Sequence, residues 1–458
     1  MTPPRLVSPA LLALAVATFA IGTAEFVIMG LLPDIAADLA IDLPRAGYLV
    51  SAYALGVVAG GPLLARAIAR CEEKRALTGL MVIFIAGNLA ALLAPGFYSL
   101  LAARLLTALS HASFMGASAV LAARLAPPGM AGRAMALTFS GMTLANILGV
   151  PGGTLLGQWA GWRATFAAVA LLGVAALLLM RARVPAQPPR SGASPDFPRL
   201  PGKVWPVLVC SVLASASMFS FFTYLLPILL QVSALPVRSG GAALLLCGLG
   251  IAAGGWIGGS LCDWRLTASL LGSLGAAALC LLGFHVQSHH LPSALALVAL
   301  WGAAAFSVCM LLQGRVIRQA GAAAPLASSL NIGAFNLGNA LGAWAGGLAL
   351  DWGFGLDHLS LLGAAIASLA LLVCAGTPTG DIQGGESQTR GDSIAERQPG
   401  HDPAEILTIE TEQRQRDTKH HHRQPEHRRH GDLTGKTQQA DQDLRHTVEH
   451  NDHQSCRE

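Results

Sequence analysis

Two ionisable side chains, Glu25 and Arg104, stand inside long apolar stretches of the sequence. A charge near the centre of a membrane helix costs about 2.5–3.5 kcal/mol or more, so such a residue indicates a partner or a function. His111 follows Arg104 by seven residues, which places both on one face of a helix. We expect Glu25 to bind and release a proton, Arg104 to tune its proton affinity and His111 to relay the proton. A buried ion pair that fixes helix packing, beside a merely hydrogen-bonded histidine, explains the same residues.

Amide, aromatic and methionine side chains form a second group within apolar segments. Asn331, Phe335 and Asn339 are spaced by four residues and form one stripe on a helix. Amides in a membrane either bridge helices or face an aqueous cavity, and aromatic or Met-rich walls suit amphipathic ligands. The aromatic residues could equally face lipid. We expect the substrate cavity to include Met29, Asn146, Phe222, Tyr224, Asn331, Phe335 and Asn339.

A glycine-rich group, GVPGG, occupies residues 149–153 of another apolar segment. Small residues let a second helix approach closely, and a Pro–Gly–Gly group permits a bend. Helix packing alone explains such a pattern in a generic glycine-rich helix. The residues that matter here are Gly149, Pro151, Gly152 and Gly153.

The elements that position these residues are long apolar helices. Hydrophobic residues make up 53% of the 458-residue chain and charged residues only 12%, about half of what soluble domains carry. About eighteen apolar residues suffice for a helix to cross the hydrocarbon core. The sequence predicts an all-α membrane protein with twelve such segments, at about 8–31, 46–66, 76–94, 98–122, 132–157, 162–183, 204–230, 239–261, 267–286, 291–313, 324–350 and 356–376.

Two segments cannot span a membrane. Residues 184–203 are rich in Pro, Ser and Arg and predict a linker between six-helix halves at 1–183 and 204–376. Residues 377–458 carry 27 of the chain's 56 Asp, Glu, Lys and Arg side chains and nine of its 14 histidines. We expect a disordered polar tail there, because so few apolar residues cannot form a core. A shifted reading frame or an unusual extension would also explain this abrupt change of composition.

Positive charge sets the expected orientation. With a cytoplasmic N-terminus, fifteen Lys and Arg residues fall on the cytoplasmic side of the predicted spans and three on the other side. This distribution follows the positive-inside rule. An even number of spans then places both termini in the cytoplasm, and we expect a multi-pass protein of a bacterial inner membrane.

Several function classes lack their sequence signals. The chain has no GxxxxGK[ST] phosphate loop, no HExxH or GxSxG motif, no paired Cys and His cluster, and no basic aromatic surface for nucleic acid. We therefore expect neither an enzyme nor an ATPase, and neither a cofactor nor a metal. An ion gradient or the substrate's own gradient would supply the energy.

The motifs resemble those of the major facilitator superfamily, in its drug:proton antiporter and sugar-efflux branch. The resemblance covers about residues 8–376. GTAEFVIMGLLPDIAADL at 22–39 resembles the first helix of that branch, and LAARLLTALSH at 101–111 resembles the fourth-helix motif, with Ala108 where the family usually has Gly. GVPGG resembles the antiporter signature, and residues 327–353 are similar to the eleventh helix of arabinose-efflux-like and chloramphenicol-resistance-like members.

This resemblance implies two pseudo-symmetric six-helix bundles around a central cavity and proton-coupled efflux of a small organic molecule, such as a drug or sugar, by a monomer. It assigns proton coupling to Glu25, Arg104 and Asp34. The loop that gates the two halves would use Gly61 and Arg66, although the expected Asp of that motif is replaced by Ala65, and the second half repeats it with Asp263 and Arg265. An uncoupled sugar facilitator or importer and a non-transporting descendant of the family are the alternatives.

Overall fold

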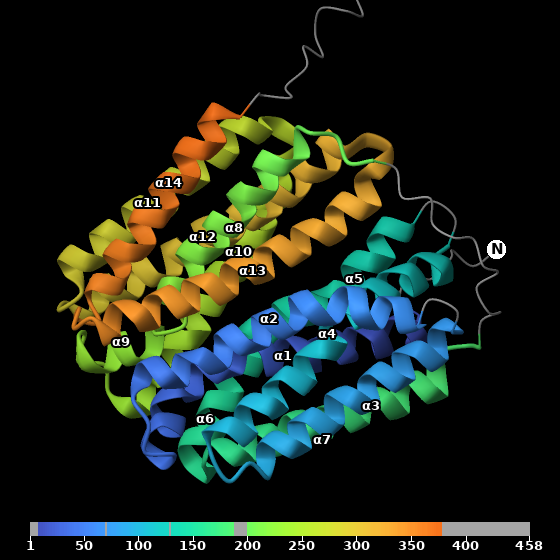
Figure 1. The fold of residues 1–458 in the computed structure, drawn as a ribbon, viewed down its shortest axis with the longest axis horizontal. Helices are drawn as coiled ribbons and strands as arrows, with labels where there is room; N and C mark the ends of the chain where they lie inside the picture. Colours follow the sequence, from blue (N-terminus) through green and yellow to red (C-terminus); the bar gives the residue numbers. More distant parts are fainter. Residues whose placement is uncertain (1–7, 69–70, 128–129, 187–198, 378–458) are drawn as a thin grey trace, which may run out of the picture. The chain divides into compact units, whose positions relative to one another are not determined.

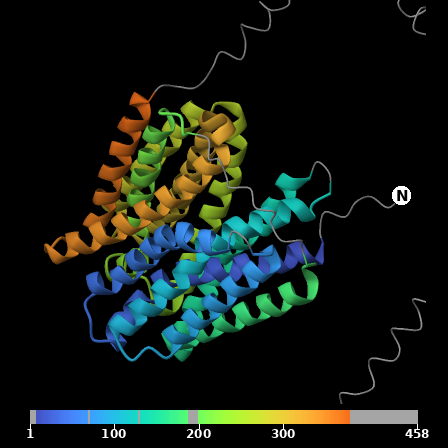
Figure 2. The ribbon, with the colours of Figure 1, turned by 45° about the vertical axis from the view of Figure 1, so that its right-hand side comes forward.

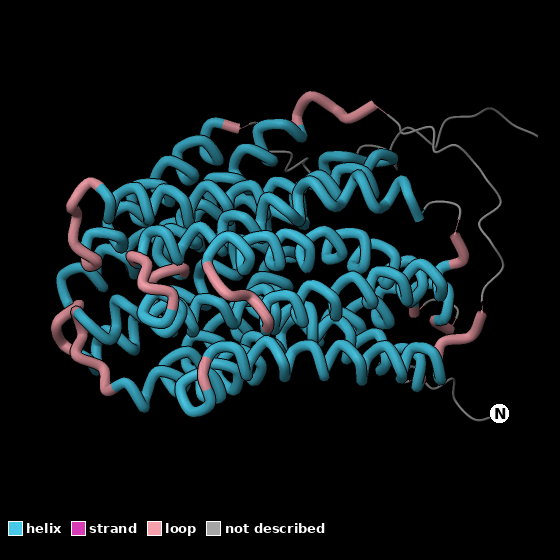
Figure 3. Tube along the Cα trace, turned by 60° about the horizontal axis from the view of Figure 1, so that its bottom comes forward, coloured by secondary structure: helices cyan, strands magenta, loops and turns pink. Residues whose placement is uncertain are grey.

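The computed structural model describes residues 8–68, 71–127, 130–186 and 199–377, and across these ranges the chain is helical with no strand (Figure 3). Most of the predicted linker and the predicted tail beyond Thr377 lie outside the described residues. The first half holds α1 (Pro9–Asp38), α2 (Leu43–Ile68), α3 (Glu73–Leu92), α4 (Phe97–Leu125), α5 (Ala131–Leu144), the π-helical turn η1 (Ala145–Gly149), α6 (Val150–Ala160) and α7 (Trp162–Arg183).

The second half begins with α8 (Val204–Phe222) and α9 (Leu225–Gln231). It continues through η2 (Val237–Ser239), α10 (Gly240–Trp264), α11 (Leu266–Gln287), α12 (Leu291–Ala320), η3 (Gly321–Ala323), α13 (Ala324–Asp351) and α14 (His358–Gly376). Figure 1 shows α1–α7 gathered on one side and α8–α14 on the other, and the turned view in Figure 2 keeps the two groups apart.

The twelve predicted spans each correspond to one long helix or one interrupted helix. Within the described residues, eleven of them are long and apolar enough to cross a membrane. The twelfth is α13, a 28-residue helix whose asparagines at 331, 336 and 339 lower its hydropathy. Several helices run past the predicted ends, because polar residues such as Asp34 and Asp38 continue the helix beyond the apolar stretch.

Two spans are interrupted near a proline. Pro151 has no N–H to donate to the preceding turn, and the π-helical turn Ala145–Gly149 lies directly before it. The Val150 N–H reaches back to the Ala145 carbonyl, which is the wider bond of a π-turn. Pro227 similarly follows the break between α8 and α9. The fifth span is therefore interrupted by a π-turn beside the Pro–Gly–Gly group, and the predicted bend stays a prediction.

Helices pack closely where one of them presents glycine. On α13, a Cβ at Gly338 would overlap the Val212 carbonyl of α8, and a Cβ at Gly342 would overlap the Ala216 carbonyl. Because the two glycines have no side chain, the backbones of α13 and α8 are in direct contact there. This contact fixes α13 against α8, while α13 also packs against α2 of the other half.

The hydrophobic cores show which end of the molecule is closed. One core joins both halves at the end where α1 finishes, and it includes Leu32 and Leu49 together with Phe219 and Leu225. At the opposite end each half has its own core, one drawn from residues 10–184 and the other from residues 204–374. The halves are therefore packed together at one end and separate at the end where α1 begins.

Candidate functional site

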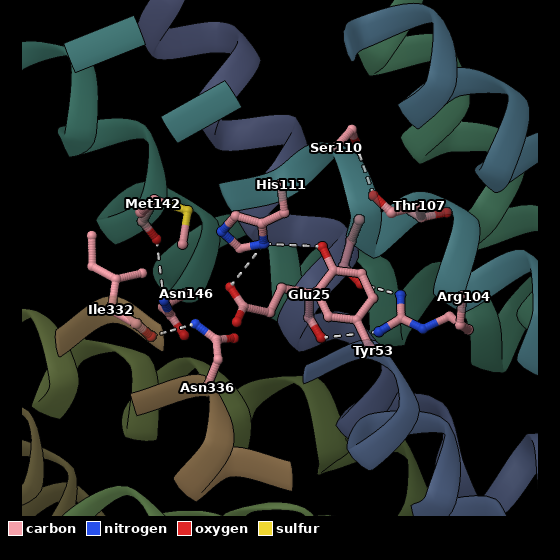
Figure 4. A network of polar contacts seen from close by, with 11 residues as sticks. Glu25, Tyr53, Arg104, Thr107, Ser110, His111, Met142, Asn146, Ile332 and Asn336 are labelled. Carbon is pink, nitrogen blue, oxygen red and sulfur yellow. Dashed lines mark hydrogen bonds and ion pairs between the residues drawn. The ribbon is translucent and has the colours of Figure 1, made fainter. Parts of the chain in front are cut away.

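Glu25 lies in the middle of α1 and is 7% exposed. Its Oε2 atom lies 3.9 Å from Nδ1 of His111 on α4, which is an ion-pair distance and too long for a hydrogen bond. Both side chains are buried, so ionisation of the carboxyl is costly here unless a neighbouring positive charge compensates it. Figure 4 shows the carboxylate pointing toward the imidazole. The pair can share a proton between an acid and a base of adjacent helices.

Tyr53 of α2 completes this group. Its hydroxyl oxygen lies 3.2 Å from the same Nδ1 atom of His111, and the tautomer of the imidazole decides which group donates. Tyr53 is 2% exposed, and its ring meets the imidazole edge-on with centroids 6.0 Å apart. One nitrogen therefore faces two partners, and movement of its proton changes the bonding of both Tyr53 and Glu25.

Arg104 holds the group against the backbone of α1. Its guanidinium donates to the carbonyl of Ala24 at 2.6 Å and to that of Glu25 at 3.4 Å. The guanidinium also lies over the Tyr53 ring, 4.2 Å from the centroid, in a cation–π contact. Arg104 is 1% exposed. Its positive charge is thus fixed beside Glu25 by main-chain bonds that do not require an ionised carboxylate.

The predicted proximity of Glu25 and Arg104 is present, but their side chains are not directly paired. Within the described residues, the ion-pair partner of the Glu25 carboxylate is His111, while Arg104 binds main-chain oxygens (Figure 4). The interpretation as a simple carboxylate–guanidinium pair is therefore wrong for this conformation. His111 and Arg104 do share one buried face of α4, as their spacing predicts.

Asp34 lies apart from this group. It is nine residues beyond Glu25 on α1, about 13 Å along the helix, and is partly buried. Asp38 is the acid of this helix end that forms an ion pair, with Arg163 at 2.5 Å, and it also accepts from the Trp162 indole at 3.0 Å. The structure therefore does not bring Asp34 together with the other predicted proton-coupling residues.

The glycine-rich segment packs along α1. A Cβ at Gly149 would overlap Oγ1 of Thr23, and a Cβ at Gly153 would overlap a methyl group of Val27. Gly152 differs, because a Cβ there would meet no atom within 4 Å. The expected close approach of a second helix therefore holds for Gly149 and Gly153, two residues that flank the level of Glu25 on α1.

The predicted aromatic wall is buried rather than exposed to lipid. Phe222 is 3% exposed and lies against Phe26 of α1 and Trp301 of α12, with ring centroids 6.5 and 6.0 Å apart. Tyr224 is fully buried and donates to the Ala343 carbonyl at 3.2 Å. Met29 and both aromatic residues belong to the core that closes one end of the molecule. They lie at the boundary of the two halves.

The asparagines of α13 have two different environments. Asn331 bridges helices, because it accepts from Ser211 of α8 at 2.6 Å and donates to Gln313 of α12 at 2.7 Å. Asn339 is 7% exposed, and its Oδ1 has no partner among the described residues. Phe335, between them, is partly buried.

Asn146 and Asn336 face each other from opposite halves. Asn146, in the π-turn, donates to the Met142 carbonyl at 3.1 Å, and Asn336 of α13 donates to the Ile332 carbonyl at 3.0 Å. Figure 4 shows the two amides pointing toward one another near Glu25. Oδ1 of Asn336 is buried and has no hydrogen-bond partner among the described residues.

The predicted gating residues are only partly described. Gly61 is partly buried on α2, and its carbonyl accepts from Ser113 of α4 at 3.2 Å. Arg66 is exposed in the last turn of α2. Arg265 is exposed at the junction of α10 and α11, and the side chain of Asp263 lies outside the described residues. The role of this group stays a prediction.

Metal binding has little support in the described ranges. No group of three or more His, Cys, Asp or Glu side chains there is placed to hold an ion. Glu25 and His111 supply two potential ligands, whereas zinc sites use three or four protein ligands.

Tyr53 belongs to this buried group, and the sequence interpretation missed it. The sequence did offer one indication of it, because Tyr53 is one of only four tyrosines in the chain and places a polar hydroxyl within an apolar segment. Spacing along the sequence could not place it beside His111, because the two residues are 58 positions apart on different helices.

Comparison with known proteins agrees with this architecture. The family model described as Major Facilitator Superfamily matches residues 14–343. The inner membrane transport protein YdhP of Escherichia coli K12 is 41% identical over 369 residues, covering 79% of this chain and 94% of the relative. A chloramphenicol resistance protein of Streptomyces lividans is 37% identical over 340 residues, covering 72% and 86%.

Solved structures share the fold at low identity. A bacterial homologue of the human lysosomal transporter Spinster, inward-facing and occupied, superposes with a TM-score of 0.63 at 17% identity and covers 80% of this chain and 95% of that one. A peptide transporter of the POT type gives a TM-score of 0.65 at 13% identity, covering 80% and 92%. The helical architecture, the family match and the relatives agree, and this chain belongs to the Major Facilitator Superfamily of multi-pass membrane transporters, which are not enzymes.

Proposed function

We propose that this transporter exports a small organic molecule across a bacterial inner membrane in exchange for protons. The observation that carries this proposal is the buried group of Glu25, His111, Tyr53 and Arg104. A carboxyl and an imidazole are costly in a membrane interior, and such groups are typical of transport pathways and proton relays. The chloramphenicol resistance relative and a sugar efflux relative of Haemophilus influenzae support the efflux direction and a drug or sugar cargo.

Alternating access would move the halves at 1–183 and 204–376 about the central site, with residues 184–203 as a cytoplasmic linker. The excess of Lys and Arg on one side of the spans supports an orientation with both termini in the cytoplasm. In that orientation the separate cores face the cytoplasm and the shared core faces the periplasm. The conformation described would then be the inward-facing state, ready to bind cargo.

The proton steps would centre on Glu25. In the inward-facing state Glu25 releases its proton to the cytoplasm, and the ionised carboxylate attracts a protonated His111 or a cationic group of the cargo. In the outward-facing state the carboxyl takes up a proton from the periplasm, loses this attraction and lets the cargo leave. Arg104 keeps its main-chain bonds in both states, so the site does not collapse when Glu25 changes charge.

A neighbouring aromatic residue would connect this proton to the closed end. Phe26 follows Glu25 on α1 and lies 6.4 Å from Phe219 and 6.5 Å from Phe222 of the second half, between ring centroids. If Glu25 moves, the next residue, Phe26, moves with it, and Phe26 contacts the core that joins the two halves. Cargo would sit next to Asn146 and Asn336, whose amides come from opposite halves.

The test is transport into inverted membrane vesicles or proteoliposomes with an imposed pH gradient, because export from the cell corresponds to uptake into the lumen of an inverted vesicle. A panel of phenicol antibiotics, sugars and amphipathic cations would be offered to the full-length protein, and uptake into the acidic lumen measured. Coupled export predicts accumulation above the outside concentration that stops when a protonophore collapses the gradient. Equilibration without accumulation would instead establish an uncoupled facilitator.

A further inference from the structure

A groove on the outer surface of the second half lies apart from the buried group around Glu25, and its lining includes one predicted gating residue, Arg265. Its cavity volume is about 450 Å³, within the range of about 300–1,000 Å³ that is typical of ligand sites. Its floor is formed by Ala303, Ala304 and Ser307 of α12, between one wall from α10 and another from α11. The Ser307 hydroxyl already donates to the Gly254 carbonyl at 2.9 Å, so the floor offers an apolar occupant no unpaired hydroxyl.

The two walls differ in the size of their side chains. On α10 the wall is made of the large residues Ile257, Leu261 and Trp264, whereas on α11 it is made of small residues, including Ala268 and Gly272. Small side chains on an exposed face of a membrane helix leave room that lipid chains must fill. The shape therefore suits a narrow, flexible apolar chain.

One end of the groove carries positive charge. Arg265 lines the groove, is exposed, and stacks on the exposed Trp264 ring with its guanidinium carbon 5.6 Å from the centroid. Arg265 is also the N-cap of the 22-residue α11, so the N–H groups of the first turn point toward the same place and favour an anion. In the proposed orientation this end lies at the cytoplasmic surface, where tryptophan and arginine are typical of the lipid headgroup region.

We propose that this groove binds one anionic phospholipid of the cytoplasmic leaflet, with an acyl chain between α10 and α11 and its phosphate at Arg265. Charge complementarity selects this occupant, because a neutral apolar molecule would gain nothing from the guanidinium or the helix N-terminus. The proposal depends on the orientation given above but not on the cargo or the coupled ion.

The experiment uses native mass spectrometry of the purified full-length protein in detergent, with dioleoylphosphatidylglycerol or dioleoylphosphatidylcholine added in equal amounts. We expect one retained phosphatidylglycerol per protein, bound about fivefold more tightly than phosphatidylcholine, the factor expected for one arginine near the membrane surface. Arg265→Gln should reduce the preference to about one. Arg238→Gln, which removes an exposed arginine at the other end of α10, should leave it unchanged.

A second variant fills the groove without touching the charge. Gly272 lines the groove, and a Cβ there would meet no atom within 4 Å, so the side chain of Gly272→Leu begins in open space at the groove. It should abolish the retained lipid. Gly259→Leu on α10 is the matched control, because Gly259 is equally open and does not line the groove.

Three results would overturn the proposal. One is equal retention of the two lipids by the wild-type protein, and another is a Gly272→Leu variant that still retains phosphatidylglycerol. The third is a dimer that Gly272→Leu breaks, which would show that a second copy of the chain covers the groove. Failure of cargo export in the vesicle assay would leave the lipid result untouched, so the two proposals fail separately.

Discussion

Nδ1 of His111 lies 3.9 Å from Oε2 of Glu25, and each side chain is at least nine-tenths buried. The two groups come from α4 and α1, so their separation depends on how these helices pack. If the helices moved slightly closer, Glu25 and His111 would form a hydrogen bond. If they moved apart, the ion pair would break and His111 would keep its contact with Tyr53. This geometry suits a pair whose shared proton changes with conformation.

Removing the Tyr53 hydroxyl should change the proton step without unfolding the site. Tyr53→Phe removes the partner of His111 at 3.2 Å but keeps the ring under Arg104. Loss of one hydrogen bond is worth about 1 kcal/mol, so we expect about a fivefold change in transport and a displaced pH profile. The measurement is initial transport rate between pH 5.5 and 8.5.

Tyr98→Phe serves as the control for this change, because its exposed hydroxyl accepts from Arg45 far from the site. It should keep the wild-type profile. A Tyr53→Phe profile that overlays the wild type would show that the hydroxyl has no part in the proton step.

Arg104 and Glu25 should differ in their effect on stability. Arg104→Gln loses a charged donor to two main-chain carbonyls and a cation–π contact, so we expect a loss of about 2–4 kcal/mol. Glu25→Gln breaks no hydrogen bond of the carboxylate with the described residues and should destabilise the protein less than Arg104→Gln does. Thermal unfolding followed by size-exclusion chromatography measures both; the reverse order would show that Glu25 is the structural residue.

The glycine-rich segment offers a comparison of two neighbours. Gly149→Ala introduces a Cβ that overlaps Thr23 Oγ1 on α1, and overpacking of this kind costs about 1–3 kcal/mol. Gly152→Ala enters open space and should be close to neutral. The melting temperature and transport rate of both variants test this. Equal loss in the two variants would mean that the contact with α1 is not what the glycines provide.

The closed end should open when its contact is crowded. A Cβ at Gly47 of α2 would overlap the Tyr224 hydroxyl of the second half, so Gly47→Leu should force the halves apart there. Spin labels at the exposed residues Asp42 and Trp352 would report this as a longer distance. Gly79→Leu, at an open position on α3, should leave the distance unchanged. An unchanged distance in Gly47→Leu would show that this contact does not hold the end closed.

The fold was predictable because hydrocarbon imposes a simple length rule. Apolar segments of sufficient length had to become helices, and all twelve did. Helix ends were less predictable, since residues 32–38 continue α1 although the apolar stretch is over. For the segment Ala145–Gly149 the sequence predicts a bend and not a π-turn. Pro151 shows that one backbone hydrogen bond is missing, but it does not show which bond the neighbouring residues form instead.

The site was only half predictable, because charge inside a membrane can be recognised but its partners cannot. The costly residues Glu25 and Arg104 stood out in the sequence, and the helical period placed His111 with Arg104. The preference of Arg104 for main-chain carbonyls and the presence of Tyr53 depend on how α1, α2 and α4 approach one another. Asn331 proved to be a bridge to Ser211 for the same reason.

The most direct test of the account compares two transport modes of Glu25→Gln in proteoliposomes. A neutral amide cannot carry a proton, while the main-chain bonds of Arg104 remain, so the site should still bind and exchange cargo. We predict that Glu25→Gln exchanges labelled for unlabelled cargo at a rate near wild type but shows no accumulation driven by a pH gradient. Accumulation equal to wild type would contradict the assignment of the coupled proton to Glu25.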